Sequence, residues 1–236
     1  MASLISRCLL PLLLSLAYLL PAVTALISPL RHRQLIEYPD DLVITPTQQG
    51  IHDGYYYTWW TDGVHNATYT NEPGGQYTVT WKRGEAGGNF IGGKGWEGGG
   101  NRTIKYSSDF QVDTDGYLAI YGYTRNPLTE WYILEYWGTY NPAVSATKMG
   151  SVSCDGGEYD IYRRKPYQQI PPGVNGPMRF YSIRREKRTG GIVTTGCHFG
   201  AWEKLQMKLG THQYQVVAVE GYHSSGSATV RIETPP

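Results

Sequence analysis

The sequence lacks a strong net charge, a cluster of metal-binding residues and an internal repeat, and each absence narrows what the protein can be. The formal net charge is only +1, which argues against nucleic acid or an acidic membrane as a partner. The 6 histidines are scattered along the chain, so we expect no bound metal. The sequence has no repeat, low-complexity tract or linker to a second module, which predicts one main domain, and we expect a monomer.

Residues 1–25 have the pattern of a secretory signal peptide. Arg7 precedes an apolar run over 8–22, and the small residues at 23–25 suit a cleavage point. A membrane anchor is the alternative, but the run is short for a span and contains two prolines. No second apolar run follows, so we expect a soluble, secreted, extracellular protein.

The segment 26–49 is polar, contains prolines and carries a basic group at 31–33. It forms either a short propeptide or a flexible N-terminal arm, and both interpretations stay open. We expect the main domain to occupy residues 50–236.

Leucine is scarce beyond the N-terminal segment, whereas 29 glycines, 20 tyrosines and 7 tryptophans are present. This composition favours strands, tight turns and aromatic surfaces. Residues 77–81 alternate between polar and apolar, and glycine-rich turns separate them from their neighbours. We therefore predict an all-β fold of two stacked antiparallel sheets.

One α-helix is predicted over 198–209, because four apolar residues recur on one face and Gly210 ends the pattern. Phe199 and Trp202 are expected to pack in the core. His198 is expected to make a structural hydrogen bond rather than to act in catalysis.

The stretch 116–142 reads as two strands joined by a polar turn at 125–127. Successive side chains on a strand point to opposite faces, so Tyr117 shares a face with Tyr121 and Glu130 with Tyr132. The opposite faces carry apolar residues suited to a core. A carboxylate among tyrosines is thus predicted on one face.

A later strand over 214–222 repeats this arrangement, because Tyr214, Glu220 and Tyr222 share one face. Two glutamates flanked by tyrosines are a plausible pair for cleaving a polysaccharide. The alternative is that both glutamates lie on edge strands and face water.

These strands resemble those of glycoside hydrolase family 11 endo-1,4-β-xylanases. Residues 127–135 and 138–142 are similar to the nucleophile strand of the family, and 219–228 to its acid/base strand. The resemblance extends in order from Gly54 to Ile232. It includes the segments 89–96, 155–162 and 198–202.

The resemblance implies a β-jelly roll with one α-helix, bent so that one sheet forms a deep cleft. It implies a retaining xylanase that acts on xylan and xylo-oligosaccharides without a cofactor, with Glu130 as nucleophile and Glu220 as acid/base. The substrate-binding residues it implies are Trp60, Asn89, Tyr117, Tyr121, Tyr132 and Tyr214. For any one tyrosine the alternative is core or surface packing, and for Asn89 it is a turn residue.

Three cysteines become two if Cys8 is removed with the signal peptide, and Cys154 and Cys197 are then expected to form a disulfide. Some family members carry a pair at the matching positions. Two unpaired buried thiols are the alternative. Asn66 and Asn101 begin triplets that are candidates for N-glycosylation.

The match to the family weakens between 163 and 182. Residues 171–176 replace the usual tip of a thumb loop, and Arg179 stands where the family has a cleft glutamine. We leave the basic residues of this segment out of the predicted site. Glu135 lies on the same strand as Glu130 but on the opposite face, so a structural role is predicted for it.

Two alternative functions remain open. One is a related β-1,4-glucanase, although tyrosines crowding the cleft should exclude the hydroxymethyl group of each glucose ring. The other is a xylan-binding or plant-recognised secreted protein with weak or no catalysis, which the altered thumb loop keeps possible.

Overall fold

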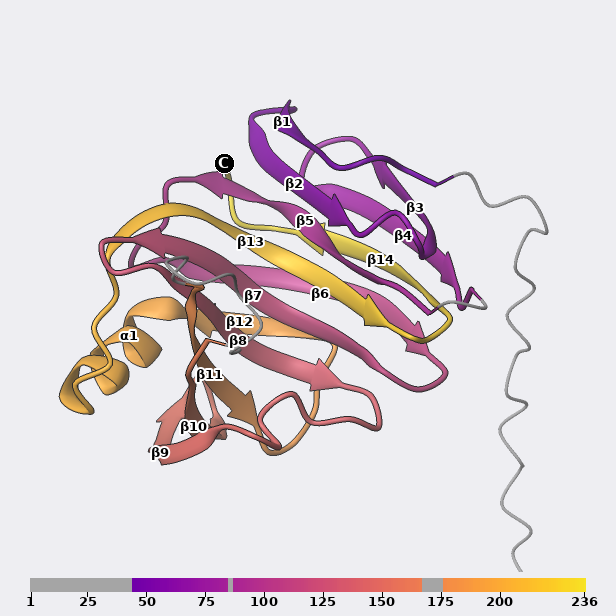
Figure 1. The fold of residues 1–236 in the computed structure, drawn as a ribbon. Helices are drawn as coiled ribbons and strands as arrows, with labels where there is room; N and C mark the ends of the chain where they lie inside the picture. The colour runs from indigo at the N-terminus through magenta and orange to yellow at the C-terminus, as the bar shows by residue number, and fades with distance from the viewer. Residues whose placement is uncertain (1–43, 85–86, 167–175) are drawn as a thin grey trace, which may run out of the picture. The chain divides into compact units, whose positions relative to one another are not determined.

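The computed structural model describes residues 44–84, 87–166 and 176–236, shown as coloured ribbon in Figure 1. The predicted signal peptide, most of the segment 26–49 and most of the thumb segment 171–176 lie outside these residues. Among the described residues, no helix is long and apolar enough to cross a membrane.

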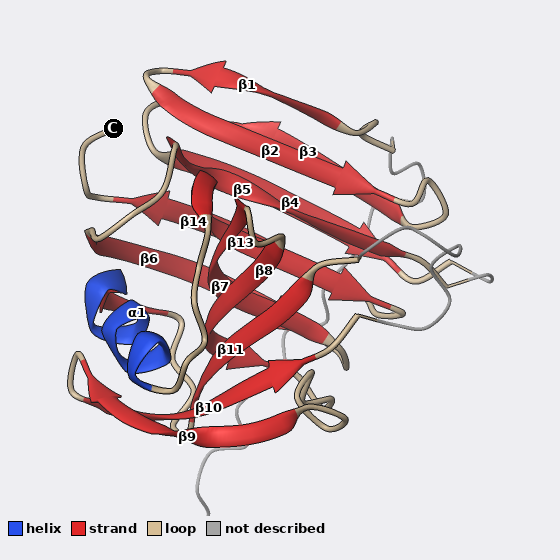
Figure 2. Ribbon diagram, turned by 60° about the vertical axis from the view of Figure 1, so that its left-hand side comes forward, coloured by secondary structure: helices blue, strands red, loops and turns tan. Residues whose placement is uncertain are grey.

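The described strands form two sheets. The larger sheet contains, in spatial order, β1 (Gln48–His52), β2 (Tyr55–Thr61), β5 (Asn89–Glu97), β13 (Thr211–Tyr222), β7 (Gly116–Arg125), β8 (Thr129–Trp137), β11 (Met178–Arg184), β10 (Gly157–Arg164) and β9 (Thr147–Cys154). The smaller sheet contains β12 (Gly190–Thr194), β6 (Thr103–Val112), β14 (Gly226–Ile232), β4 (Gln76–Lys82) and β3 (Asn66–Asn71). Figures 1 and 2 show the smaller sheet stacked against one face of the larger, so the predicted jelly roll is confirmed.

One strand pair departs from the expected antiparallel pattern. β8 and β11 run parallel, with Glu130 opposite Arg179 and Tyr132 opposite Tyr181. A parallel neighbour needs a long connection, and here β9 and β10 separate the two strands in the chain. This pairing brings residues from the far side of the thumb segment next to Glu130.

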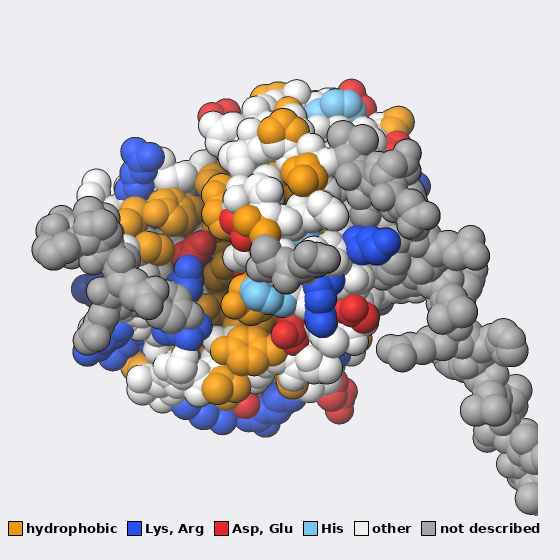
Figure 3. Space-filling view, turned by 45° about the vertical axis from the view of Figure 1, so that its right-hand side comes forward, with side chains coloured by type: hydrophobic (Ala, Val, Ile, Leu, Met, Phe, Trp, Pro, Cys, Tyr) orange, Lys and Arg blue, Asp and Glu red, His pale blue; other side chains and the backbone are white. Residues whose placement is uncertain are grey.

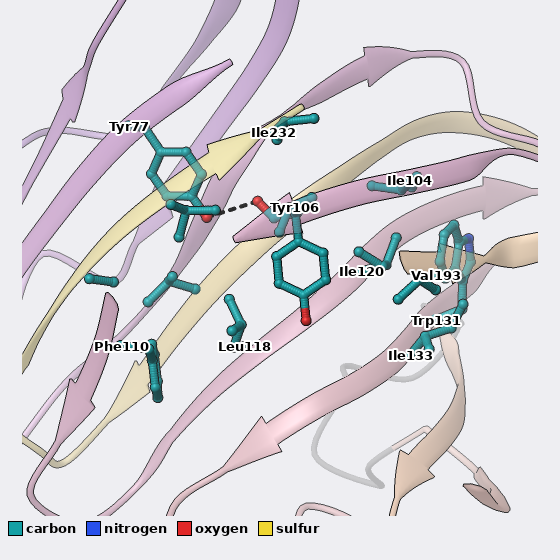
Figure 4. Close-up of a cluster of buried hydrophobic side chains, with 14 of the residues drawn as sticks. Tyr77, Ile104, Tyr106, Phe110, Leu118, Ile120, Trp131, Ile133, Val193 and Ile232 are labelled. Carbon is teal, nitrogen blue, oxygen red and sulfur yellow. Dashed lines mark hydrogen bonds between the residues drawn. The ribbon is translucent and has the colours of Figure 1, made fainter. Parts of the chain in front are cut away.

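Aromatic side chains fill the space between the two sheets. Trp59, Trp81 and Trp131 are fully buried there, together with Tyr77. Burying so much ring surface stabilises the sandwich, but each polar ring atom then needs a partner. The Tyr77 hydroxyl finds one in the backbone oxygen of Val217, drawn as a dashed line in Figure 4.

The central strand β8 is buried on both faces for most of its length. Trp131 and Ile133 pack in the core between the sheets, whereas Tyr132 and Leu134 belong to a second apolar cluster on the other face. That second cluster is rich in tyrosine from β7, β8, β11 and β13. The larger sheet therefore presents an aromatic surface on the face away from the smaller sheet.

The helix α1 spans Thr195–Lys204 rather than the predicted 198–209. It starts early because Asp155 accepts bonds from the backbone N–H and hydroxyl of Thr194, and Thr195 is bonded to the backbone near Gly100. It ends early because Gln206 takes a positive φ of 59°. The tertiary contacts at the start could not be read from apolar spacing.

The expectations for the helix side chains were partly right. Trp202 is fully buried and Phe199 packs against the same core. His198 is also fully buried, but within the described residues neither ring nitrogen has a hydrogen-bond partner. Its ring packs edge-on against Tyr159, with ring centroids 4.6 Å apart. The predicted structural hydrogen bond of His198 is therefore wrong, because aromatic packing holds the ring instead.

The predicted disulfide is confirmed. Cys154, the last residue of β9, is bonded to Cys197 in the first turn of α1, with Cα atoms 6.2 Å apart. The bridge joins the edge of the larger sheet to the helix.

The N-terminal end of the described chain is already part of the fold. Gln48 and Gln49 pair with β2, and the Thr45 backbone N–H donates to Ala67. The domain boundary predicted at Gly50 therefore falls inside β1.

Candidate active site

Glu130 lies on the aromatic face of the larger sheet, between two neighbouring strands. In the ladder it is opposite Tyr123 of β7 on one side and Arg179 of β11 on the other. The Tyr121 hydroxyl donates to Glu130 Oε1 at 2.9 Å, and Arg179 Nε donates to Oε2 at 2.5 Å. Its side chain is 14% exposed, so the carboxylate is held by two donors and still reaches solvent.

Glu220 comes from the next strand but one, β13, where it is opposite Ile91 of β5 and Tyr117 of β7. Burial and, to a smaller extent, the negative charge of Glu130 raise the pKa of Glu220 to about 8, while the positive charge of Arg179 opposes both effects. Glu220 therefore carries a proton at neutral pH. A protonated carboxyl facing a carboxylate is the pairing that an acid catalyst and a nucleophile require.

Two cavities of about 350 Å³ and 900 Å³ lie over this face, and we call them together the cleft. Both are lined by Asn89, Tyr132, Arg179 and Glu220. The space-filling view shows a hollow where hydrophobic side chains surround acidic and basic ones (Figure 3).

All eight residues predicted for the site line the cleft. Trp60, Tyr121, Glu130 and Tyr214 line the larger cavity, Tyr117 lines the smaller one, and Asn89, Tyr132 and Glu220 line both.

The tyrosines of the cleft pack on one another as a continuous layer. The Tyr132 ring centroid lies 4.9 Å from that of Tyr121 and 5.1 Å from that of Tyr181, and Tyr214 lies 5.9 Å from Tyr121. Burial, and then the negative charge of Glu130, raises the pKa of Tyr121 and Tyr132. Their hydroxyls therefore stay protonated and can donate hydrogen bonds.

Trp60 on β2 and Asn89 on β5 lie on the side of β13 away from β7 and β8. Trp60 pairs with Ile91 of β5 and is 44% exposed, which leaves its ring face open to a ligand. Asn89 is opposite Tyr222, two residues beyond Glu220. The Asn89 side-chain oxygen is buried and has no hydrogen-bond partner among the described residues.

Arg179 was left out of the predicted site, yet it lines both cavities and pairs with Glu130. Alternation along 179–183 would have placed Arg179 and Tyr181 on one face, opposite Phe180. Alternation does not say which strand lies beside these residues. Only the parallel pairing with β8 places Arg179 next to Glu130. Arg164, Tyr181 and Tyr140 also line the smaller cavity and were not predicted.

Glu135 lies on the opposite face of β8 from Glu130, as predicted, and is fully buried. It accepts hydrogen bonds from Tyr159 at 2.6 Å and Tyr106 at 3.2 Å, and it pairs with Arg188. This carboxylate has no access to the cleft.

In residues 44–84, 87–166 and 176–236, no group of three or more His, Cys, Asp or Glu side chains could hold a metal ion. Two carboxyl groups, one protonated and one ionised, can cleave a glycosidic bond by themselves.

Comparison with known proteins places these features in a family. The family model described as Glycosyl hydrolases family 11 matches residues 52–231. Ethylene-inducing xylanase 3 of Verticillium longisporum is 48% identical over 208 residues, which are 87% of this chain and 69% of that protein. Endo-1,4-beta-xylanase 11B of Humicola insolens is 48% identical over 191 residues, which are 80% of this chain and 64% of that protein. Ethylene-inducing xylanase 1 of Verticillium dahliae is 49% identical, again with 80% of this chain and with 84% of that protein covered. The chain spans about two thirds of the length of the first two relatives.

Proposed function

The chain belongs to glycosyl hydrolase family 11, and on this premise we propose that it is an endo-1,4-β-xylanase that cuts internal bonds of xylan with retention of configuration. The observation that carries the proposal is the unlike environment of the two carboxyl groups. Glu130 accepts hydrogen bonds from Tyr121 and Arg179, whereas burial and the charge of Glu130 keep Glu220 protonated.

The reaction proceeds in two displacements. In the first, a Glu130 oxygen attacks the anomeric carbon while Glu220 gives its proton to the departing glycosidic oxygen. The bond to the leaving sugar breaks, and a covalent glycosyl ester on Glu130 remains. In the second, Glu220, now ionised, takes a proton from water as that water attacks the same carbon, and the electron pair returns to Glu130.

The cleft suits a chain of xylose units. The flat faces of the sugar rings stack on exposed Trp60, and the hydroxyls of Tyr117, Tyr132 and Tyr214 meet the equatorial hydroxyls of the sugars. Because tyrosines crowd the cleft, rings that carry a hydroxymethyl group are excluded. Xylan is therefore the substrate and a β-1,4-glucan is not.

We further propose that residues 1–25 are a signal peptide and that the mature protein is secreted as a monomer. The Cys154–Cys197 disulfide supports this location, since such bonds persist mainly outside the cytosol. Asn101 is exposed and Asn66 is part-buried, so of the two candidate sites Asn101 is the more accessible to glycosylation.

One assay separates the enzyme functions. Soluble xylan and carboxymethyl-cellulose are incubated with the wild type and with Glu220→Gln, and reducing ends are counted. We expect release from xylan only, greatly reduced in the variant. Proton NMR of the first products should show β-anomers. Initial α-anomers, or cleavage of the cellulose derivative alone, would contradict the proposal.

A second candidate function is recognition by plants independent of catalysis. Two of the three relatives described above are named ethylene-inducing xylanases. Wild type and the inactive Glu130→Gln/Glu220→Gln protein would be applied to leaf tissue at equal concentration. Equal ethylene release from both would establish this second function, and release from the wild type alone would assign the response to catalysis.

A further inference from the structure

Arg179 is the feature of the cleft that the two-carboxylate reaction leaves unexplained. Neither displacement needs a cation, yet the guanidinium contacts Glu130 directly and lines both cavities. We propose that Arg179 is a positioning residue that stabilises Glu130 as the leaving group of the second displacement and so keeps the covalent intermediate short-lived. This inference rests on the proposed retaining mechanism.

The geometry holds the two side chains together in a single arrangement. Arg179 and Glu130 are opposite each other in the parallel β8–β11 ladder, so their backbones fix the separation. The guanidinium is only 29% exposed and the carboxylate 14%, which limits screening of the pair by water. Tyr121 holds the other carboxylate oxygen at 2.9 Å, so the carboxylate cannot turn away from Arg179 without losing a second bond.

The charge on Glu130 changes during the reaction, so the positive charge of Arg179 affects the barriers of the two displacements differently. In the first displacement the carboxylate becomes a neutral ester, so the ion pair weakens as the transition state forms. In the second the C–O bond to Glu130 breaks and its electron pair restores the carboxylate beside Arg179. A fixed cation stabilises the transition state in which negative charge develops. Arg179 therefore favours the second displacement over the first.

The same cation acts on Glu220. The charged side chains that line the cleft with it are Glu97 from β5, Arg125 from β7, Glu130 from β8, Arg179 from β11, Arg164 from β10 and Asp115 before β7. After burial, the pKa of Glu220 responds to Glu130, which raises it, and to Arg179, which lowers it. Tyr117 and Tyr132 have raised pKa values through burial and stay neutral. Loss of Arg179 should thus raise the pKa of Glu220.

The test uses Arg179→Gln, which keeps a hydrogen-bond donor but removes the charge. With 4-nitrophenyl β-xylobioside the first displacement is fast, because nitrophenolate leaves without a proton. We expect the variant to release a burst of one nitrophenolate per enzyme and then turn over on the order of 10- to 100-fold more slowly than wild type. Intact-protein mass spectrometry during turnover should show the xylobiosyl enzyme in the variant but little in the wild type.

A pH profile of kcat/KM on xylan adds a second readout. The alkaline limb of Arg179→Gln should move to higher pH, whereas Arg179→Lys, which keeps the charge, should retain the wild-type limb. Arg185→Gln is the matched control, because it removes one charge from an exposed pair with Asp160 that does not line the cleft. It should behave as the wild type in both assays.

The possible outcomes separate this inference from the proposed function. The inference would be overturned if Arg179→Gln gave no burst, accumulated no ester and kept the wild-type alkaline limb. It would also be overturned if the control Arg185→Gln showed the same changes as Arg179→Gln. If Arg179→Gln does not fold, Arg179→Met, which keeps the aliphatic length, is measured under the same criteria. If the wild type cleaves no xyloside, the proposed function fails. Carbon-13 NMR titration of Glu220 in wild type and variant then still tests the charge effect of Arg179.

Discussion

Strand β8 carries two carboxylate–arginine pairs five residues apart, one on each face, and they serve opposite purposes. Glu135 is fully buried and its oxygens are taken by Tyr106, Tyr159 and Arg188. Glu130 has two donors and reaches an open cleft. A carboxylate that is fully buried and held by three donors serves to hold the fold together. A carboxylate with fewer donors, next to a protonated partner, can react.

Neutralising each carboxylate in turn should separate the catalytic role of Glu130 from the structural role of Glu135. Glu130→Gln removes the nucleophile, so kcat on xylan should fall by at least about 10⁴-fold. The midpoint of thermal unfolding should change little, because Arg179 still reaches solvent in the cleft. Steady-state kinetics and calorimetry check both parts. A variant that kept a tenth of wild-type activity would remove Glu130 from the mechanism.

Glu135→Gln should lower the stability of the protein and leave its activity nearly unchanged. It replaces a fully buried carboxylate and leaves Arg188, which is 21% exposed, without its partner, and breaking such a pair costs up to about 3–5 kcal/mol of unfolding free energy. Specific activity of the folded enzyme should stay near that of the wild type. Urea unfolding measures the loss, and Glu158→Gln, at an exposed position, is the control. A loss of less than 1 kcal/mol would mean that the Glu135 network is not structural.

His198 lies beside the buried Glu135 network, because it packs on the ring of Tyr159, whose hydroxyl donates to Glu135. Burial lowers the pKa of His198 to about 4, with Asp155 opposing and Arg188 adding to the effect. The unfolded chain takes up the proton first as pH falls below about 6.5, so stability is full above that pH and is lost on the way down to 4.

His198→Phe should abolish that part of the pH dependence. Over the window from pH 6.5 to 4 the wild type should lose on the order of 3 kcal/mol more than the variant. Denaturant unfolding at several pH values gives both curves. Parallel curves would mean that His198 can be protonated in the folded protein.

Asn89→Asp, a substitution in the cleft, should give the smallest change. It should only displace the profile of kcat/KM against pH. Asn89 lines both cavities with Glu220, and its buried side-chain oxygen can accept a hydrogen bond from protonated Glu220 without adding a titrating group. With the Glu220 pKa at about 8, the wild type should work best near neutral pH. An aspartate would share one proton with Glu220, and the pair must keep it to act as the acid.

The optimum of Asn89→Asp should therefore be distinctly more acidic, and its alkaline limb should move to lower pH. The measurement is kcat/KM on xylan as a function of pH for both proteins. Superimposable profiles would show that Asn89 does not act on Glu220.

Local alternation was enough to predict which side chains share a face. It placed Glu130 with Tyr132 and Glu220 with Tyr214, and put Glu135 on the far side of its strand, because the period of two is a property of the extended backbone. Turn residues and composition were enough for an all-β sandwich. The resemblance to the family then supplied the roles of the residues, which alternation alone does not.

Three features depended on tertiary contacts. The start of α1 follows from Asp155 in the turn between β9 and β10, the ring of His198, which bonds to no described residue, is held by packing against Tyr159, and the position of Arg179 follows from the parallel pairing of β8 with β11. Each is decided by a partner that lies far away in the chain. The two carboxyl groups and the strand faces they occupy could thus be predicted from residue order alone. Only the folded sheets decided which charges stand beside them, because strand order and register place Arg179, and not another basic residue of the same segment, against Glu130.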